Sequence, residues 1–208
     1  MTKYFSSLNQ DINLPVLKEL RKKAVEDDVP IIQEDGLRFI RQLLTIKKPK
    51  RILEIGTAIG YSTIAMALFS DAFITTVERD EMRANEAKMN IEEAGLCDRI
   101  QLIKGDALEI DITQFEAVDI LFIDAAKAQN IKFFEQYQSL VKEGGLIITD
   151  NLLFHGLFDE EVDSRNVRQL LRKINDFNEY ILDRKGYDTV IYEIGDGMSV
   201  SIKKGGNR

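Results

Sequence analysis

Two acidic residues directly follow two apolar segments in the second half of the sequence, and an amide residue follows the second acid. The first segment ends at Asp124, and the second ends at Asp150 and Asn151. Consecutive strands that pair in parallel place their carboxyl ends at one edge, about 4.8 Å apart, so these side chains would converge there. Two carboxylates and an amide oxygen suit Mg²⁺, with water or substrate as further ligands. The alternative is that these residues only form turns after strands.

A lysine lies close to the first acid in the sequence. Lys127 follows Asp124 by three residues and would fall at the same sheet edge. A nearby cation makes an amine easier to deprotonate, so Lys127 is a candidate general base. The alternative is an ordinary surface lysine. His155, the only histidine, follows Asn151 in the sequence and is a candidate contact to the substrate.

A glycine-containing turn between an apolar strand and a helix predicts a ligand site. Gly56 and Gly60 form a G-x-x-x-G pattern, and Glu78 closes the next apolar segment about 20 residues later. The pattern lacks the middle glycine that admits a pyrophosphate, which favours a nucleoside ligand over NAD. An acid at this distance is placed to accept hydrogen bonds from ribose hydroxyls. A generic α/β turn with a surface acid is the alternative.

Strand and helix patterns alternate along the chain and would position these residues. We predict strands over 51–55, 73–78, 100–104, 118–123 and 146–149, and helices over 15–26, 33–46, 61–69, 80–94, 130–141 and 164–183. Such a βαβ series predicts a parallel sheet with helices on both faces. At the end, strands over 189–194 and 198–202 flank an Asp-Gly turn, which predicts an antiparallel hairpin at the sheet edge.

Composition indicates one domain, residues 1–208, in which helices within residues 1–46 cap the site. Residues 1–14 are polar and are expected to be weakly structured. With a single cysteine, no signal-like apolar core and no apolar run of about 18 residues, we expect a cytoplasmic protein without a membrane segment. The net charge of −7 opposes indiscriminate binding to DNA or other nucleic acids. Local basic clusters, one of them at residues 165–173, still leave a basic face open, with a solvated surface as the alternative.

Five motifs together resemble the cation-dependent O-methyltransferases of the catechol and caffeoyl-CoA type. The similarity extends over residues 29–202. The motifs are Leu-Glu-Ile-Gly-Thr-Ala-Ile-Gly-Tyr-Ser, Val-Glu-Arg, Gly-Asp-Ala, Phe-Ile-Asp-Ala-Ala-Lys and Thr-Asp-Asn. The resemblance implies a Rossmann-like class I methyltransferase fold of the α/β class, with a mostly parallel seven-stranded sheet. Within the family, the chain is most similar to bacterial members that methylate 5-hydroxyuridine in tRNA.

The resemblance also implies a role for individual residues. Lys127 matches the lysine proposed as the base, and Asp124 would act beside it. Mg²⁺ would be held by Asp124, Asp150 and Asn151. S-adenosylmethionine would be held by Ile32, Gly56, Gly60, Ser62, Glu78, Asp106, Ala107 and Asp124. One residue departs from the catechol enzymes, which carry a histidine where this chain has Ala125, and this weakens the transfer of catechol specificity.

The resulting prediction is an S-adenosylmethionine- and Mg²⁺-dependent O-methyltransferase that converts 5-hydroxyuridine at the tRNA wobble position to 5-methoxyuridine. The expected partners are the anticodon loop of tRNA and, by resemblance, a second copy of the chain in a homodimer. The first alternative is an enzyme for small catechols or hydroxycinnamoyl esters. A binding module without turnover is a further alternative, and the missing middle glycine disfavours an NAD-dependent oxidoreductase.

Overall fold

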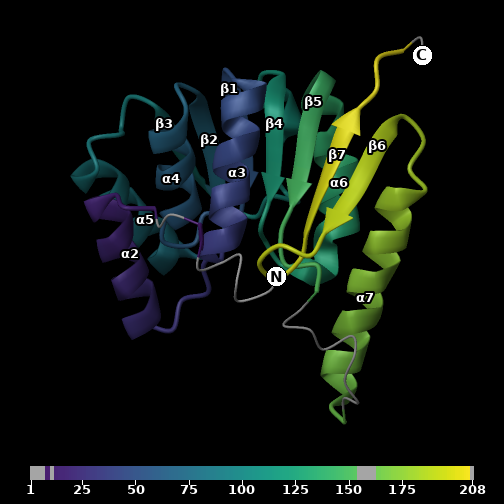
Figure 1. The fold of residues 1–208 in the computed structure, drawn as a ribbon, viewed down its shortest axis with the longest axis horizontal. Helices are drawn as coiled ribbons and strands as arrows, with labels where there is room; N and C mark the ends of the chain where they lie inside the picture. Colours follow the sequence, from purple (N-terminus) through teal and green to yellow (C-terminus); the bar gives the residue numbers. More distant parts are fainter. Residues whose placement is uncertain (1–7, 10–11, 154–162, 207–208) are drawn as a thin grey trace.

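A seven-stranded sheet forms the centre of the computed structural model, which describes residues 8–9, 12–153 and 163–206. The strand order is β3-β2-β1-β4-β5-β7-β6, with β7 antiparallel to both neighbours and every other pair parallel (Figure 1). The strands are β1 (Arg51–Ile55), β2 (Phe73–Glu78), β3 (Ile100–Lys104), β4 (Val118–Ile123), β5 (Val141–Thr149), β6 (Tyr187–Tyr192) and β7 (Met198–Lys203). This order confirms the predicted Rossmann-like class I methyltransferase fold.

Helices cover both faces of the sheet (Figure 1). One layer contains α2 (Pro15–Glu26), α3 (Glu34–Lys47), α4 (Tyr61–Phe69) and α5 (Glu81–Glu93), and the other contains α6 (Asn130–Tyr137) and α7 (Arg165–Leu182). Ile52 and Phe122 pack into the first layer, whereas Leu53 and Leu121 pack into the second. The central strands β1 and β4 are mostly apolar because both of their faces are buried. Within the described residues, no helix has the length and hydrophobicity needed to cross a membrane.

The boundary between α6 and β5 differs from the prediction. The helix ends at Tyr137, a 3₁₀ turn, η3 (Gln138–Leu140), follows, and β5 begins at Val141 rather than at residue 146. Val141 pairs with Val118, and the register then shifts before Leu146 pairs with Ile120. The polar and glycine residues after Val141 have the composition of a turn, so the sequence pattern did not show that they extend a strand.

The C-terminal hairpin is antiparallel, as predicted, with Val190 opposite Val200. Its first strand begins two residues earlier than predicted, at Tyr187. The ring of Tyr187 packs 5.2 Å from that of Phe134 on α6, so contact with the second helix layer places the start of this strand.

The N-terminal segment is more ordered than predicted at one position. Ile12 is only 8% exposed, and its backbone N–H donates to Glu34 Oε1 at 3.4 Å. Glu34 also pairs with Arg21 of α2 at 2.8 Å and with Arg38 of α3 at 2.7 Å. The expectation of a weakly structured segment is therefore wrong for Ile12, because its backbone is held by Glu34, a residue 22 positions later that no local pattern pairs with it.

Candidate active site

The register of the parallel strands brings their carboxyl ends to one edge of the sheet. Ile55 at the end of β1 lies opposite Val77 of β2 and Ile123 of β4. Backbone bonds continue one residue further, since Asp124 N–H donates to Ile55 O at 2.9 Å and Asp150 N–H donates to Ile123 O at 3.1 Å. The residues that follow each strand therefore stand side by side, as the sequence predicted.

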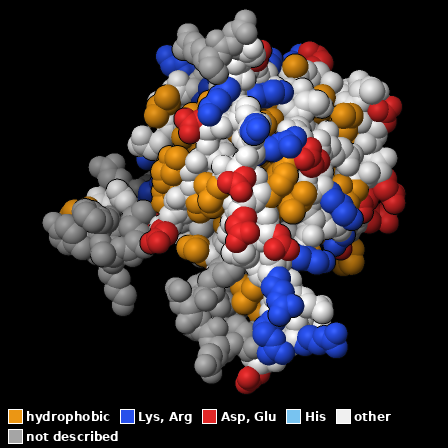
Figure 2. All heavy atoms as spheres, turned by 90° about the vertical axis from the view of Figure 1, so that its right-hand side faces the viewer, with side chains coloured by type: hydrophobic (Ala, Val, Ile, Leu, Met, Phe, Trp, Pro, Cys, Tyr) orange, Lys and Arg blue, Asp and Glu red, His pale blue; other side chains and the backbone are white. Residues whose placement is uncertain are grey.

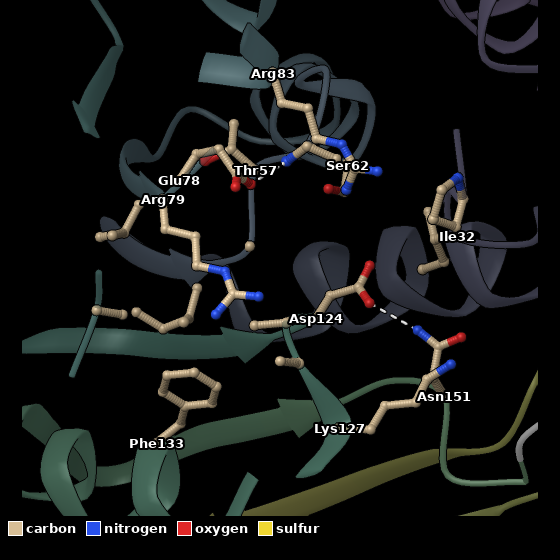
Figure 3. Close-up of a pocket in the computed structure, with 18 of the residues that line it drawn as sticks. Ile32, Thr57, Ser62, Glu78, Arg79, Arg83, Asp124, Lys127, Phe133 and Asn151 are labelled. Atoms are coloured by element: carbon tan, nitrogen blue, oxygen red, sulfur yellow. Dashed lines mark hydrogen bonds between the residues drawn. The ribbon is translucent and has the colours of Figure 1, made fainter. Parts of the chain in front are cut away.

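A cavity of about 300 Å³ opens at this edge (Figure 3). The predicted site residues that line it are Ile32, Gly56, Ser62, Glu78, Asp106, Ala107, Asp124, Lys127 and Asn151. Two other predicted residues support the surface from behind it. Gly60 precedes α4 as its N-terminal cap, and Asp150, only 4% exposed, accepts the N–H of Asn151 at 2.8 Å.

The glycine turn is held in place from both sides. Gly56 has a φ of +101°, and a Cβ built on it would lie 2.1 Å from the carbonyl oxygen of Asp124. Only glycine fits this approach of two strands. Glu78 Oε2 accepts the N–H of Ala58 at 2.8 Å, and its Oε1 accepts the N–H of Asp80 at 2.9 Å. Glu78, the residue predicted to bind the ribose hydroxyls, therefore also holds the glycine turn in place.

A carboxylate behind the turn, Glu54, was not singled out from the sequence. Glu54 is fully buried on β1 and accepts hydrogen bonds from Ser62 Oγ at 2.6 Å, from Thr76 Oγ1 at 2.6 Å and from the hydroxyl of Thr63. These donors come from α4 and β2, so one side chain joins three elements around the cavity. The sequence pattern treats Glu54 as an interruption of an apolar strand, and only the fold supplies its partners.

Replacing Glu54 with glutamine should change how stability depends on pH. Burial raises the pKa of Glu54 from 4.5 to about 7, so the folded state favours the neutral carboxyl. This contribution to the free energy of unfolding is fully present below the unfolded-state pKa of 4.5, and it is lost as pH rises through the folded-state pKa of about 7. Because one pKa unit is worth about 1.4 kcal/mol, we expect wild type to lose about 2 kcal/mol more than E54Q between about pH 5 and about pH 8.

Urea unfolding of both proteins without divalent metal measures this difference. Carboxyl groups that do not interact with Glu54 titrate alike in the two proteins and cancel, so the difference reports Glu54 together with its charge coupling to Asp124. Equal losses in wild type and E54Q would show that the pKa of Glu54 is not raised in the folded state.

The two predicted metal-binding carboxylates lie on either side of Asn151. Asp124 Oδ1 accepts a hydrogen bond from Asn151 Nδ2 at 2.7 Å (Figure 3). Burial raises the pKa of Asp124, whereas Lys127 and Asn151 act in the opposite direction. Burial also raises the pKa of Asp150, and the charge of Asp124 adds to the effect. Two buried carboxylates that repel each other are stabilised in their charged form by a bound cation.

The composition of this acidic group limits which metal it suits. In the part of the chain that the structure describes, no three His, Cys, Asp or Glu side chains form a group that could hold a metal ion. A metal held by Asp124 and Asp150 would need the amide oxygen of Asn151 as its third protein ligand. Three oxygen donors suit Mg²⁺ better than zinc, whose sites rely mainly on nitrogen and sulfur ligands.

Hydrogen bonds also fix the loop after β3. The Ala107 carbonyl accepts the hydroxyl of Tyr137 at 2.6 Å and Gln136 Nε2 at 3.0 Å. Asp106 Oδ1 accepts the N–H of Leu108 at 2.9 Å. These bonds hold the loop as the wall of the cavity, on the side of β3.

Several side chains that line the cavity were missed by the sequence analysis. They include Tyr61 and the three residues Arg79, Arg83 and Phe133, which are labelled in Figure 3. Arg79 directly follows Glu78 before the helix and Arg83 lies in the first turn of α5, so no single sequence pattern links the two arginines. His155, the candidate substrate contact, lies outside the described residues.

The sequence profile of a family described as O-methyltransferase matches residues 6–204. The chain belongs to the O-methyltransferase family. Curated relatives in this family include a caffeoyl-CoA O-methyltransferase from Populus kitakamiensis, 32% identical over 88% of this chain and 84% of the relative. A catechol O-methyltransferase from Niastella koreensis is 32% identical over 80% of this chain and 79% of the relative.

Solved structures of O-methyltransferases share this architecture. A provisionally named caffeoyl-CoA O-methyltransferase from Staphylococcus aureus is 43% identical, with a TM-score of 0.90 over 97% of this chain and 98% of the other. An O-methyltransferase from Bacillus cereus, solved in complex with S-adenosylhomocysteine, is 29% identical, with a TM-score of 0.79 over 93% and 94% of the two chains. The family and the fold therefore agree with the expectations from the motifs.

Proposed function

We propose that this O-methyltransferase uses S-adenosylmethionine and Mg²⁺ to methylate a hydroxyl group that has a second oxygen next to it. The observation that carries the proposal is that Asn151, at the cavity edge, is hydrogen-bonded to both Asp124 and Asp150, while Lys127 lines the same cavity. The Bacillus cereus relative with bound S-adenosylhomocysteine, the demethylated cofactor, supports the choice of methyl donor.

The cavity contains suitable groups for each part of the cofactor. Glu78, at the end of β2, would accept hydrogen bonds from the ribose hydroxyls. Asp106 and Ala107 would border the adenine, and the turn from Gly56 would lie under the amino-acid part, near Ser62 and Ile32. All of these residues line the same cavity, and Gly60 shapes the turn from behind.

The chemistry follows from these groups. When bound, Mg²⁺ lowers the pKa of an acceptor hydroxyl and holds the adjacent oxygen, and S-adenosylmethionine supplies an electrophilic methyl group. Lys127 Nζ, at the same edge as Asp124, would take the hydroxyl proton. The strand ends hold Asp124 and the glycine turn in fixed relative positions, and such positioning supplies a large part of the rate.

Small phenols with neighbouring oxygens are the first acceptor class. Catechols and hydroxycinnamoyl esters have this arrangement, and the relatives named catechol and caffeoyl-CoA O-methyltransferase support it. Ala125 and Ala126 line the cavity beside Asp124 and leave space at the acceptor side.

A second class, 5-hydroxyuridine in tRNA, is favoured by the surface of α7. Its 5-hydroxyl and 4-carbonyl would be the adjacent oxygens. The first half of α7 extends beyond the strand ends, on the side of the cavity (Figure 1), and Figure 2 shows basic side chains gathered there. The exposed basic residues are Arg165, Arg168, Arg172 and Lys173. Basic side chains next to a site attract a phosphate backbone.

An acceptor panel tests the function. We expect the purified protein to methylate catechol, caffeoyl-CoA or tRNA from cells lacking this gene, with EDTA lowering the rate more than about 100-fold. Nucleoside mass spectrometry would detect 5-methoxyuridine. If tRNA is the acceptor, reversing Arg168 and Arg172 to glutamate should lower kcat/KM for tRNA about tenfold more than for a phenol. A rate that EDTA leaves unchanged would contradict the role of the metal.

A further inference from the structure

Three basic side chains line the cavity, and they occupy different parts of it. Lys127 lies next to Asp124 and Asn151, and Arg79 points toward the space between Glu78 and Asp124 (Figure 3). Arg83 lies at the opposite end, with its guanidinium group beside Ser62 (Figure 3). Each basic group can therefore meet a different part of a bound ligand.

Packing between α5 and the glycine turn places Arg83 there. Asn90 Nδ2 donates to the carbonyl of Ile59 at 2.8 Å, and a Cβ on Gly60 would lie 3.5 Å from the Cβ of Ala87. Arg83 is one helical turn before Ala87, so it reaches over the same glycine turn. Its own N–H donates to Asp80 Oδ1 at 2.9 Å, at the start of the helix.

The guanidinium group of Arg83 is available to a ligand. It forms no ion pair with any of the residues that the structure describes, and the side chain is exposed. An arginine presents up to five N–H donors in a planar arrangement that matches a carboxylate. A ligand with a carboxylate at this end of the cavity would find a matching group.

Ser62 cannot donate to a ligand carboxylate while its own hydroxyl donates to the ionised form of Glu54. The Ser62 hydroxyl donates to Glu54 Oε1 at 2.6 Å, so its oxygen presents only lone pairs to the cavity. A hydroxyl in this state accepts from an ammonium group but does not donate to a carboxylate. The amino-acid part of S-adenosylmethionine has both groups, and its carboxylate therefore needs another donor.

We infer that Arg83 binds the carboxylate of the methionine part of the cofactor, while Ser62 accepts from its ammonium group. The inference rests on the proposed cofactor and adds a residue that positions it. The cofactor also carries a positive sulfonium group, so a basic side chain in its site needs a reason. The carboxylate gives that reason, because it is the group that the Arg83 guanidinium attracts.

Calorimetry with two ligands tests the inference. S-adenosylhomocysteine carries the carboxylate, whereas 5′-methylthioadenosine keeps the adenosine and the sulfur but lacks the amino-acid part. For Arg83→Gln we expect about 10- to 100-fold weaker binding of S-adenosylhomocysteine and a change below about twofold for 5′-methylthioadenosine. Arg79→Gln makes the same charge change in the same cavity. It should change the affinities for S-adenosylhomocysteine and 5′-methylthioadenosine by the same factor.

The salt dependence of S-adenosylhomocysteine binding is a second test, and it does not require 5′-methylthioadenosine to bind. Salt should reduce the affinity of wild type for S-adenosylhomocysteine several-fold more than that of Arg83→Gln, because salt screens an exposed ion pair. The inference would be overturned if Arg83→Gln weakened the binding of both ligands equally. It would also be overturned if the affinities of wild type and Arg83→Gln for S-adenosylhomocysteine depended equally on salt. If wild type fails to bind S-adenosylhomocysteine at all, the proposed cofactor is wrong instead, so the two failures are distinguishable.

Discussion

Replacing Asp150 with asparagine should reduce kcat/KM about a thousandfold and weaken Mg²⁺ binding at least about 100-fold. The substitution removes one of the two carboxylates that we propose as metal ligands and keeps its shape. The amide of the new side chain would retain an oxygen that can accept the N–H of Asn151, as Asp150 Oδ1 does at 2.8 Å. Since burial already raises the pKa of Asp150, a neutral side chain here should cost little stability.

Titration calorimetry with Mg²⁺ and steady-state kinetics measure these effects. Asp188→Asn is the matched control, because it makes the same chemical change on the exposed side of β6. S-adenosylhomocysteine binding and the melting temperature should stay close to the wild-type values in both variants. Normal Mg²⁺ affinity and activity in D150N would remove Asp150 from the metal site.

Replacing Gly56 with alanine should destabilise the protein by about 3–5 kcal/mol and abolish cofactor binding. The new Cβ would lie 2.1 Å from the backbone oxygen of Asp124, and φ is +101°. The two strands cannot move apart without cost, since Gly56 N–H donates to Val77 O at 3.0 Å and Asp124 N–H donates to Ile55 O at 2.9 Å. Urea unfolding and S-adenosylhomocysteine titration would report both losses.

Gly95→Ala separates the effect of the close contact from the effect of backbone conformation. Gly95 also has a positive φ, +67°, but no described atom lies within 4 Å of its Cβ position. We expect a loss of about 1 kcal/mol there, with cofactor binding retained. If the two alanine variants were equally stable, the approach of Gly56 to Asp124 would not be the restricting feature.

The sequence predicted the sheet well where apolar residues dominate a strand. The strands at 51–55, 73–78, 100–104 and 118–123 have the bounds that the structure shows. The strands β1 and β4 are almost wholly buried between two helix layers, so their apolar residues define them, whereas β3 at the sheet edge is only partly buried. Prediction was less accurate at Val141, where polar and glycine residues continue a strand because the facing strand, beginning at Val118, pairs with it.

The part of the candidate site that follows directly from strand order could also be predicted from the sequence. Parallel strands end at one edge, so residues such as Asp124 and Asp150, which directly follow strands, had to come together once the topology was right. The partners of buried polar groups could not be derived in this way. Ser62 and Thr76 reach Glu54 from different elements, and nothing in the sequence pairs them.

The sequence by itself determined the fold class, the glycine turn and the acids that follow the strands, because these depend on local residue order and on which segments are apolar. Only the tertiary structure decided that Glu54 accepts the hydrogen bond of the Ser62 hydroxyl and that α5 places Arg83 over the glycine turn. Both contacts depend on how helices pack on the sheet. Such packing is set by the fit of many side chains that are distant in the sequence, and no local pattern records it.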